Sequence, residues 1–359
     1  MTKFYSMGRD RKRALLRKKC FVFTVAALLL FTALFAGACE KPKAEPADEP
    51  AEVVPEPPET YPWPYVGTET TDAAIVKNRP LSVKIENSSA ARPQMGLNEA
   101  DIIYETMVEG GETRFNCIFQ STIPDEVGPV RSARHSDLWI VPQYQGLFFY
   151  SGANAEVLGK LRKIDIGDMS HNAAGSLYHR VSFRSAPHNL YLELSKAYEK
   201  AAEIGIETSS ENLTPLKFGV SDAVPTATAS ALTVSFASKS AARWDWNAER
   251  QVYLRTQGGG PHKDATTDEQ IFSTNVVVIV AEYTKAQTLD PAGNPTYDTN
   301  LGGTGKAIVF KDGMQYDCQW TADKDTPPKF TDAAGKEITL NPGRTWIEVP
   351  TPAISITIE

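Results

Sequence analysis

The chain has 359 residues, of which 42% are hydrophobic, 23% charged and 9% aromatic. These fractions exclude a disordered polymer, a collagen, a disulfide-dense mini-protein and a multi-span membrane protein. The first 38 residues carry eight Lys or Arg against one Asp, so the net charge of the remaining chain is −14 rather than −7. Such an acidic body argues against nucleic acid as a partner.

Residues 1–38 have the organisation of an export signal. Basic residues occur throughout the first twenty positions, an uncharged and mostly apolar run covers residues 21–35, and three small residues precede Cys39. The run is shorter than the roughly 20 residues that a membrane-spanning helix needs. A Cys directly after small residues resembles a lipobox, the site where bacterial lipoproteins are cleaved and acylated. We therefore expect a lipid anchor such as palmitate on Cys39, at the extracytoplasmic face of the cell membrane, with an uncleaved signal anchor as the alternative.

Residues 39–74 are predicted to be an acidic, Pro-rich tether. Residues 40–60 contain six Pro and seven acidic residues against two Lys. Such a segment cannot bury apolar area and should stay extended and solvated. The aromatic and Pro-rich residues 61–65 are expected to lie against the folded body in polyproline form, although a free docking peptide is the alternative.

Residues 75–220 are predicted to form an N-terminal α/β domain. Period-2 and buried apolar runs indicate strands, and apolar spacing of three to four indicates helices. Asn189 is a suitable N-cap for the last of these helices. The expected strands cover 81–85, 102–105, 115–120 and 147–150, with residues 109–111 joining the second to the third, and the expected helices cover 138–144, 155–164 and 190–204.

Residues 228–359 are predicted to form a mostly β domain, after a boundary in the Ser, Thr, Ala and Pro-rich stretch 220–230. Asp312-Gly313 is a strong signal for a two-residue hairpin turn. The expected strands cover 232–236, 244–246, 252–255, 275–283, 308–310, 314–320, 345–349 and 354–358. By length and by this change in pattern we expect two domains and an α+β fold.

Two cysteines remain in the body, Cys117 and Cys318. Alternation places each on the apolar face of its strand. We expect two separate core thiols, or else a disulfide between the two domains, which a non-reducing compartment allows.

One candidate site follows the turn at Gly128-Pro129. Arg131 and Arg134 lie three residues apart, beside a helix expected to start near Ser132. Guanidinium groups and free N–H groups could converge there on a carboxylate or phosphate. Alternatively, both Arg pair with acids of the same domain, such as Glu105 and Glu109. Ser132 lacks the surroundings of a nucleophile elbow.

Two further candidates contain histidine. His188 precedes the predicted cap Asn189 at a loop corner, so it could act as a general base, bind a ligand, or be a satisfied structural residue. His262 and Asp264 follow a triple Gly that lets a backbone approach a ligand closely, although a flexible hairpin end is the alternative. The histidine spacing matches no metal motif, so we expect no metal and no cofactor.

Longer motifs occur at residues 79–87, 91–94, 96–97, 100–102, 109–111, 113–115, 128–134, 260–264, 275–278 and 342–346. Together they resemble the YerB-like family of bacterial lipoproteins. The resemblance covers residues 78–350, departs from the usual Asp at Glu86, and implies a lipoprotein with a two-part domain of unknown function. It also gives more weight to Arg131, Arg134, His188 and His262.

Two functions are consistent with these features. The first is a non-catalytic envelope lipoprotein that binds a cell-wall component or a membrane-protein partner through a polar cleft between the domains. The second is an envelope hydrolase or transferase, in which Glu105 or Glu109 is the acid or base, Arg131 and Arg134 hold an anion, and His188 or His262 moves protons. The candidate ligand-binding residues are Glu105, Glu109, Arg114, Arg131, Ser132, Arg134, His188, Asn189, His262 and Asp264.

Overall fold

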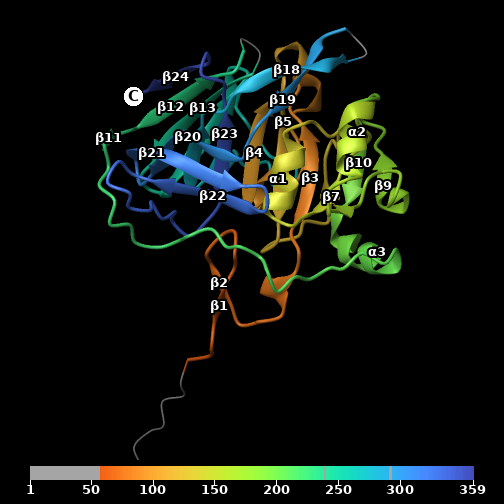
Figure 1. Cartoon of the computed structure of the whole chain (residues 1–359), viewed down its shortest axis with the longest axis horizontal. Coiled ribbons are helices and arrows are strands. Elements are labelled where there is room, and N and C mark those ends of the chain that lie inside the picture. Colours follow the sequence, from red (N-terminus) through yellow and green to blue (C-terminus); the bar gives the residue numbers. More distant parts are fainter. Residues whose placement is uncertain (1–56, 238–239, 291–292) are drawn as a thin grey trace, which may run out of the picture. The chain divides into compact units, whose positions relative to one another are not determined.

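An 11-stranded sheet runs through both halves of the sequence (Figure 1). A computed structural model describes residues 57–359 apart from 238–239 and 291–292. In it the strand order is β11-β21-β20-β17-β23-β4-β5-β3-β7-β8, with β22 paired to β21. The strands are β3 (Leu81–Glu86), β4 (Ile102–Met107), β5 (Thr113–Phe119), β7 (Leu147–Phe149), β8 (Gly167–Asp168), β11 (Ala227–Thr228), β17 (Asn275–Ile279), β20 (Gly303–Lys311), β21 (Met314–Asp323), β22 (Thr326–Thr331) and β23 (Thr345–Val349).

The predicted N-terminal and C-terminal parts meet inside this sheet. Strand β23 pairs with β4 in parallel, with Thr345 opposite Ile102 and Glu348 opposite Glu105. Pro58–Glu359 is one compact unit. Backbone hydrogen bonds therefore join residues that lie more than 200 positions apart in the chain, although the exact domain boundary between residues 220 and 228 stays a prediction.

A second, six-stranded sheet has the order β15-β14-β13-β12-β24, with β16 paired to β14. Its strands are β12 (Ala231–Ser235), β13 (Ala241–Asn247), β14 (Val252–Gln257), β15 (Gly260–Pro261), β16 (Phe272–Ser273) and β24 (Ser355–Ile358). Three smaller pairings are β6-β10-β9 (Glu126–Val127, Leu190–Glu193, Tyr178–Arg180), β1-β2 (Tyr61–Pro62, Glu69–Thr70) and β18-β19 (Tyr283–Leu289, Pro295–Thr299).

Helices are short and belong mainly to the first half of the sequence, which confirms the predicted α+β class. The α-helices are α1 (Asp137–Gln143), α2 (Ala155–Leu161) and α3 (Ala197–Glu203), and the 3-10 turns are η1 (Ile75–Lys77), η2 (Ser89–Ala91), η3 (Leu97–Glu99), η4 (Glu109–Gly111), η5 (Gly175–Leu177) and η6 (Leu194–Lys196). Helices α1 and α2 confirm two of the three predicted helices. The predicted helix 190–204 is wrong in its first half, because residues 190–193 pair as strand β10 with β6 and β9.

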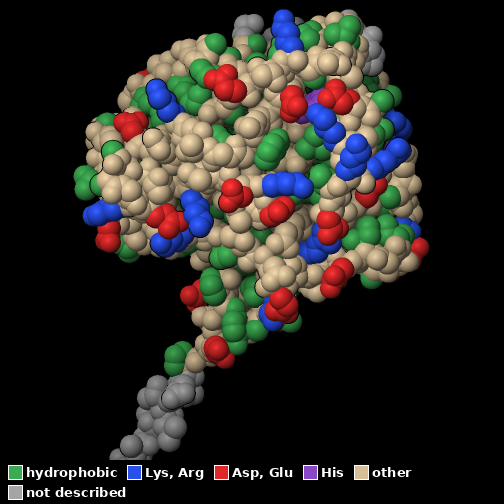
Figure 2. All heavy atoms as spheres, viewed as in Figure 1, with side chains coloured by type: hydrophobic (Ala, Val, Ile, Leu, Met, Phe, Trp, Pro, Cys, Tyr) green, Lys and Arg blue, Asp and Glu red, His purple; other side chains and the backbone are tan. Residues whose placement is uncertain are grey.

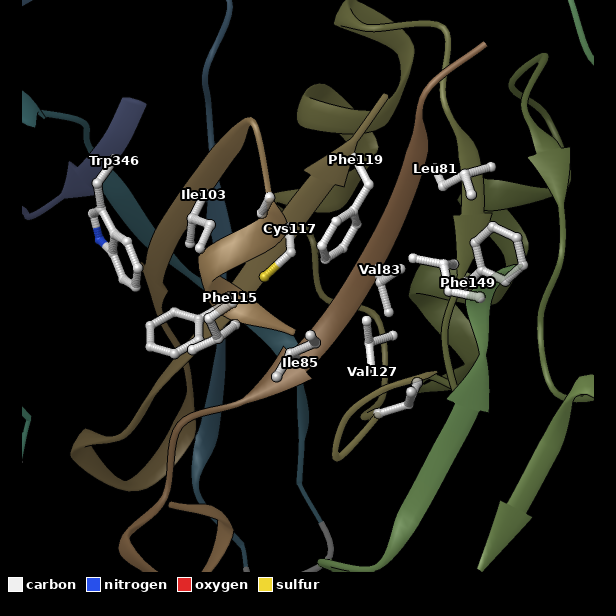
Figure 3. Packing of buried hydrophobic residues seen from close by; sticks show 14 of the residues in the cluster. Leu81, Val83, Ile85, Ile103, Phe115, Cys117, Phe119, Val127, Phe149 and Trp346 are labelled. Atoms are coloured by element: carbon white, nitrogen blue, oxygen red, sulfur yellow. The ribbon is translucent and has the colours of Figure 1, made fainter. Parts of the chain in front are cut away.

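Apolar side chains from the two large sheets pack against each other. Alternate residues of β3, Leu81, Val83 and Ile85, point into this core and are fully buried (Figure 3). Phe115 lies edge-on to Trp346 with ring centroids 5.0 Å apart, so the core joins strands from both halves. A second apolar cluster includes Tyr104, Ile140 and Tyr144 and buries the other side of the sheet beneath α1.

The segment before the sheet is also anchored to the body. Tyr65 is fully buried, and its ring lies 5.1 Å from that of Tyr144. Residues 61–65 lie against the body as predicted, but the predicted polyproline form is wrong at Tyr61–Pro62, which pairs as a short strand with Glu69–Thr70. Acidic and basic side chains are interspersed over the face of the body shown in Figure 2.

The turn between β20 and β21 forms at the predicted residues. Asp312 and Gly313 have φ angles of 55° and 68° between β20 and β21, which confirms the predicted hairpin. Cys117 and Cys318 are both free thiols, the first of them buried. Within the described residues, no helix has the length and apolar character needed to cross a membrane.

Candidate functional site

Glu105 forms a buried ion pair with Arg255 across the two large sheets. Arg255 Nη2 lies 2.5 Å from Glu105 Oε2, and both side chains are fully buried. The guanidinium carbon lies 4.7 Å from the centroid of the Trp346 ring. Asn87 Nδ2 and Thr113 Oγ1 donate hydrogen bonds to the other Glu105 oxygen, at 3.0 and 2.6 Å. The carboxylate predicted as a possible acid or base is therefore fully engaged by the scaffold.

His262 is held next to this ion pair. An Arg can only donate, so His262 Nδ1 accepts from Arg255 Nη1 and the proton lies on Nε2, which donates to Gln94 Oε1 at 2.7 Å. Burial, and secondarily the charges of Arg255 and Arg92, hold the pKa of His262 well below its ordinary value. A neutral ring with both nitrogens occupied connects Arg255 of β14 to Gln94 in the loop before β4 and supplies no free base.

Glu348 was not foreseen from the sequence, although it completes the buried cluster. It is fully buried opposite Glu105 and accepts a hydrogen bond from Trp244 Nε1 at 2.8 Å. Burial, and then the charge of Glu105, raise the pKa of Glu348 well above its ordinary value. A single Glu between Ile347 and Val349 in a buried strand was the available sequence signal, since such a carboxyl needs a buried partner.

A second charged cluster surrounds Glu86 at the end of β3. His188 Nδ1 lies 2.8 Å from Glu86 Oε1, which also accepts a hydrogen bond from Ser88. Arg131 Nε lies 3.4 Å from the other oxygen, and the Arg131 side chain is 24% exposed. The carboxyl group is buried while His188 and Arg131 reach the surface, so this cluster is a polar, accessible surface with its charges paired internally.

Arg134 pairs with Glu109, as one of the two sequence-based alternatives expected. Arg134 Nε and Nη2 donate to Glu109 Oε2 at 2.9 and 2.8 Å. Arg114 Nη1 donates to the carbonyl of Ser132 at 2.8 Å, and burial together with Arg134 and Arg131 lowers the pKa of Arg114 to about 9. Arg131 pairs with Glu86 rather than with Glu105, the other acid that was considered.

The predicted convergence of these Arg with a helix start is wrong. Helix α1 begins at Asp137, beyond both Arg, and Ser136 makes no side-chain cap. Asp137 Oδ2 accepts from the backbone N–H of Arg134, and Oδ1 pairs with Lys84 Nζ at 2.8 Å in a fully buried contact. Asp137 at the helix start is thus engaged by the Arg134 backbone and by Lys84 of β3.

Asn189 and Asp264 stabilise loops. Asn189 does not cap a helix; its Oδ1 accepts from Arg180 at 2.6 Å and its Nδ2 donates to the carbonyl of Val181. Asp264 is fully buried and accepts from the backbone N–H groups of Asn98 and Thr266. Asn189 is thus occupied within its own hairpin, while Asp264 joins its loop to the segment around Asn98.

Gln94 connects the Glu105 and Glu86 clusters. Its Nε2 donates to the backbone carbonyl of Glu86 at 2.8 Å, while its Oε1 accepts from His262. The structure therefore brings Glu105, His262, His188 and Arg131 into one polar network. Glu109, Arg114, Ser132 and Arg134 form a second group, and Asn189 and Asp264 belong to neither. Cys39 lies outside the described residues, and within them there is no group of three His, Cys, Asp or Glu side chains that could hold a metal ion.

Comparison with known proteins identifies relatives over most of the body. Residues 65–207 match the description "Protein of unknown function (DUF3048) N-terminal domain", and residues 232–347 match its C-terminal domain. The chain is 28% identical over 286 residues to "Putative lipoprotein YerB" of Bacillus subtilis (strain 168), covering 78% of this chain and 83% of that protein. The crystal structure of the Bacillus subtilis YerB protein superimposes with a TM-score of 0.73 and 27% identity, covering 83% of this chain and 99% of that one.

Proposed function

The chain belongs to the two-part DUF3048 family of proteins of unknown function, and on this premise we propose that it is a lipid-anchored protein of the bacterial cell envelope that binds a ligand without transforming it. The anchor would be an acyl chain on Cys39, on the extracytoplasmic side of the membrane. The lipobox-like residues before Cys39 and the similarity to a protein named as a lipoprotein support this placement.

One observation carries the proposal for binding over catalysis. The four side chains suited to acid–base work are all engaged by other side chains: Glu105 by Arg255, Glu109 by Arg134, His188 by Glu86, and His262 by Arg255 and Gln94. A general acid or base must reach the reacting atom directly or through one water. Glu105 and His262 are also buried, so neither meets this condition.

The ligand is proposed to be a cell-wall component or a membrane-protein partner of the envelope, and nucleic acid is not expected. The partly exposed Arg131 and His188 provide a polar surface, and the body outside the signal is strongly acidic. Acidic surfaces repel the phosphate backbone of nucleic acids.

The test is retention of purified envelope fractions on the immobilised full chain in detergent micelles. We expect wall fragments or solubilised envelope protein to be retained and to elute chemically unchanged, as judged by mass spectrometry. The variant Lys77→Ala, which removes a solvent-exposed ion pair with Glu211, serves as a control that should retain the same material. No retention of any fraction would overturn the proposal. Turnover of the retained material that disappears in Glu105→Gln or His188→Ala would instead establish the hydrolase or transferase alternative.

A further inference from the structure

We propose that a recess beside residues 92–93 binds an oxyanion, a carboxylate or phosphate group carried by the envelope ligand. This inference rests on the proposed function and names the chemical group that such a ligand presents. The recess has a volume of about 370 Å3 and lies against the turn between β14 and β15. It is lined by Arg92, Pro93, Gln257, Gly258, Pro261, His262 and Lys263.

Arg92 supplies an uncommitted positive charge. Its Nη1 atom is buried and has no hydrogen-bond partner, and among the described residues its side chain forms no ion pair. Glu105 and Glu112 act on it only at longer range. A Cβ added at Gly258 would lie 3.4 Å from Nη1, so Gly at this left-handed position lets the turn between β14 and β15 lie close against the guanidinium.

Gln257 supplies a second donor with a fixed orientation. Its Oε1 accepts from Arg255 Nη1 at 2.8 Å, and because Arg only donates, the amide cannot flip without losing this bond. Its Nε2 is left without a partner in a residue that is 7% exposed. Buried donors without acceptors are costly, and an anionic oxygen would satisfy both this amide and Arg92.

The other lining residues favour a ligand that combines an anionic group with an uncharged part. Lys263 adds a positive charge near the rim, although it also contacts the exposed Asp268 at 2.9 Å. His262 is neutral, as its hydrogen bonds and lowered pKa require. Pro93 and Pro261 form apolar walls against which a sugar or aliphatic group could pack. The site as a whole would repel a cation.

Isothermal titration of the full chain in detergent micelles tests the site. Inorganic phosphate and acetate are titrated in separate arms at constant ionic strength, with sodium chloride as the blank. We expect saturable binding of phosphate, acetate or both. The anion that binds more tightly indicates whether the natural ligand presents a phosphate or a carboxylate. Arg92→Gln should weaken that binding at least tenfold, while Arg92→Lys should recover part of it.

A second variant guards against effects on folding. Gln257→Glu keeps an acceptor for Arg255 but replaces the free amide with an oxygen, so it should also weaken binding at least tenfold. Lys77→Gln, at an exposed residue outside the recess lining, should leave binding unchanged. Absence of saturable binding, or equal binding by both site variants and the wild type, would overturn the inference.

The outcome can be separated from that of the proposed function. If the full chain retains envelope material equally well after Arg92→Gln, the recess is not its ligand site and only this inference fails. If oxyanions bind the recess but no envelope fraction is retained, the proposed function fails while the anion site stands.

Discussion

Glu348 lies directly opposite Glu105 on adjacent parallel strands, so the sheet brings two buried carboxyl groups together where the two halves of the chain meet. Arg255 enters from the second sheet and pairs with Glu105. The buried cluster contains two carboxyl groups and one guanidinium, so its charges balance only if one carboxyl group keeps its proton. The raised pKa of Glu348 identifies Glu348 as the protonated carboxyl group. The cluster therefore joins three strands from both halves by charge as well as by apolar packing.

Removal of Arg255 should destabilise the whole body. Arg255→Met leaves Glu105 buried without its ion-pair partner and should lower the free energy of unfolding by about 3 to 5 kcal/mol. Urea denaturation followed by tryptophan fluorescence measures this change. The control Lys77→Met breaks an exposed pair with Glu211 and should cost less than about 1 kcal/mol. Similar costs for the two variants would contradict the buried ion pair.

The protonated state of Glu348 predicts a pH dependence with a definite sign. A carboxyl whose pKa is raised on folding contributes stability that is fully present below its unfolded pKa, near 4.5, and is lost as the pH rises through the folded pKa. Glu348→Gln cannot ionise and keeps an acceptor for Trp244. We expect the free energy of unfolding of this variant, relative to wild type, to increase from pH 5 to pH 8, measured by urea denaturation.

Asp101 also makes the folded protein less stable as the pH rises, because burial raises its pKa to about 6. This contribution is the same in the wild type and in Glu348→Gln. The difference between Glu348→Gln and wild type therefore isolates Glu348. A difference that stays constant from pH 5 to pH 8 would show that Glu348 is ionised in the folded protein.

The two Arg that follow Pro129 should differ in their contribution to stability. Arg134→Ala leaves the buried Glu109 without two short hydrogen bonds and should cost about 2 to 3 kcal/mol. Arg131→Ala removes a longer, partly exposed contact with Glu86, which keeps His188 and Ser88, and should cost about 1 kcal/mol or less. Thermal and urea unfolding of both variants give the comparison, and the reverse order would contradict it.

The N-terminal segment should contribute to the stability of the body. Tyr65→Ala removes a fully buried ring from the cluster around Tyr144 and should cost about 3 kcal/mol. Tyr61→Ala, at a partly exposed position four residues earlier, is the matched control and should cost less than about 1 kcal/mol. Equal unfolding midpoints for wild type and Tyr65→Ala would mean that the segment is not docked in solution.

Acylation of Cys39 is the test of the predicted anchor. Cys39→Ala should yield an unprocessed precursor that incorporates no clickable fatty acid, because the acyl chain attaches to this sulfur. Wild type should show a labelled, shorter mature form on a gel. Labelling of the Cys39→Ala variant would contradict the lipobox assignment.

The sequence by itself determined the local features of this protein. Alternating apolar residues located most long strands, the left-handed Asp312-Gly313 turn specified a hairpin, and apolar spacing located α1 and α2. The predicted export signal, the predicted acylation of Cys39 and the family resemblance also came from short contiguous motifs. All of these depend on residues that are near neighbours in the chain, where pattern and propensity act directly.

Only the tertiary structure decided how the charged residues are used. Glu105 meets Arg255 across 150 positions and Glu348 across 243, and neither separation leaves a periodic signal in the sequence. Residues 190–193 form strand β10 because β6 and β9 pair with them on both sides, which outweighs their helical spacing. Whether a guanidinium is free or paired depends on which loops fold beside it. Arg131 and Arg134 therefore proved to be paired with acids, while Arg92 was left facing an open recess.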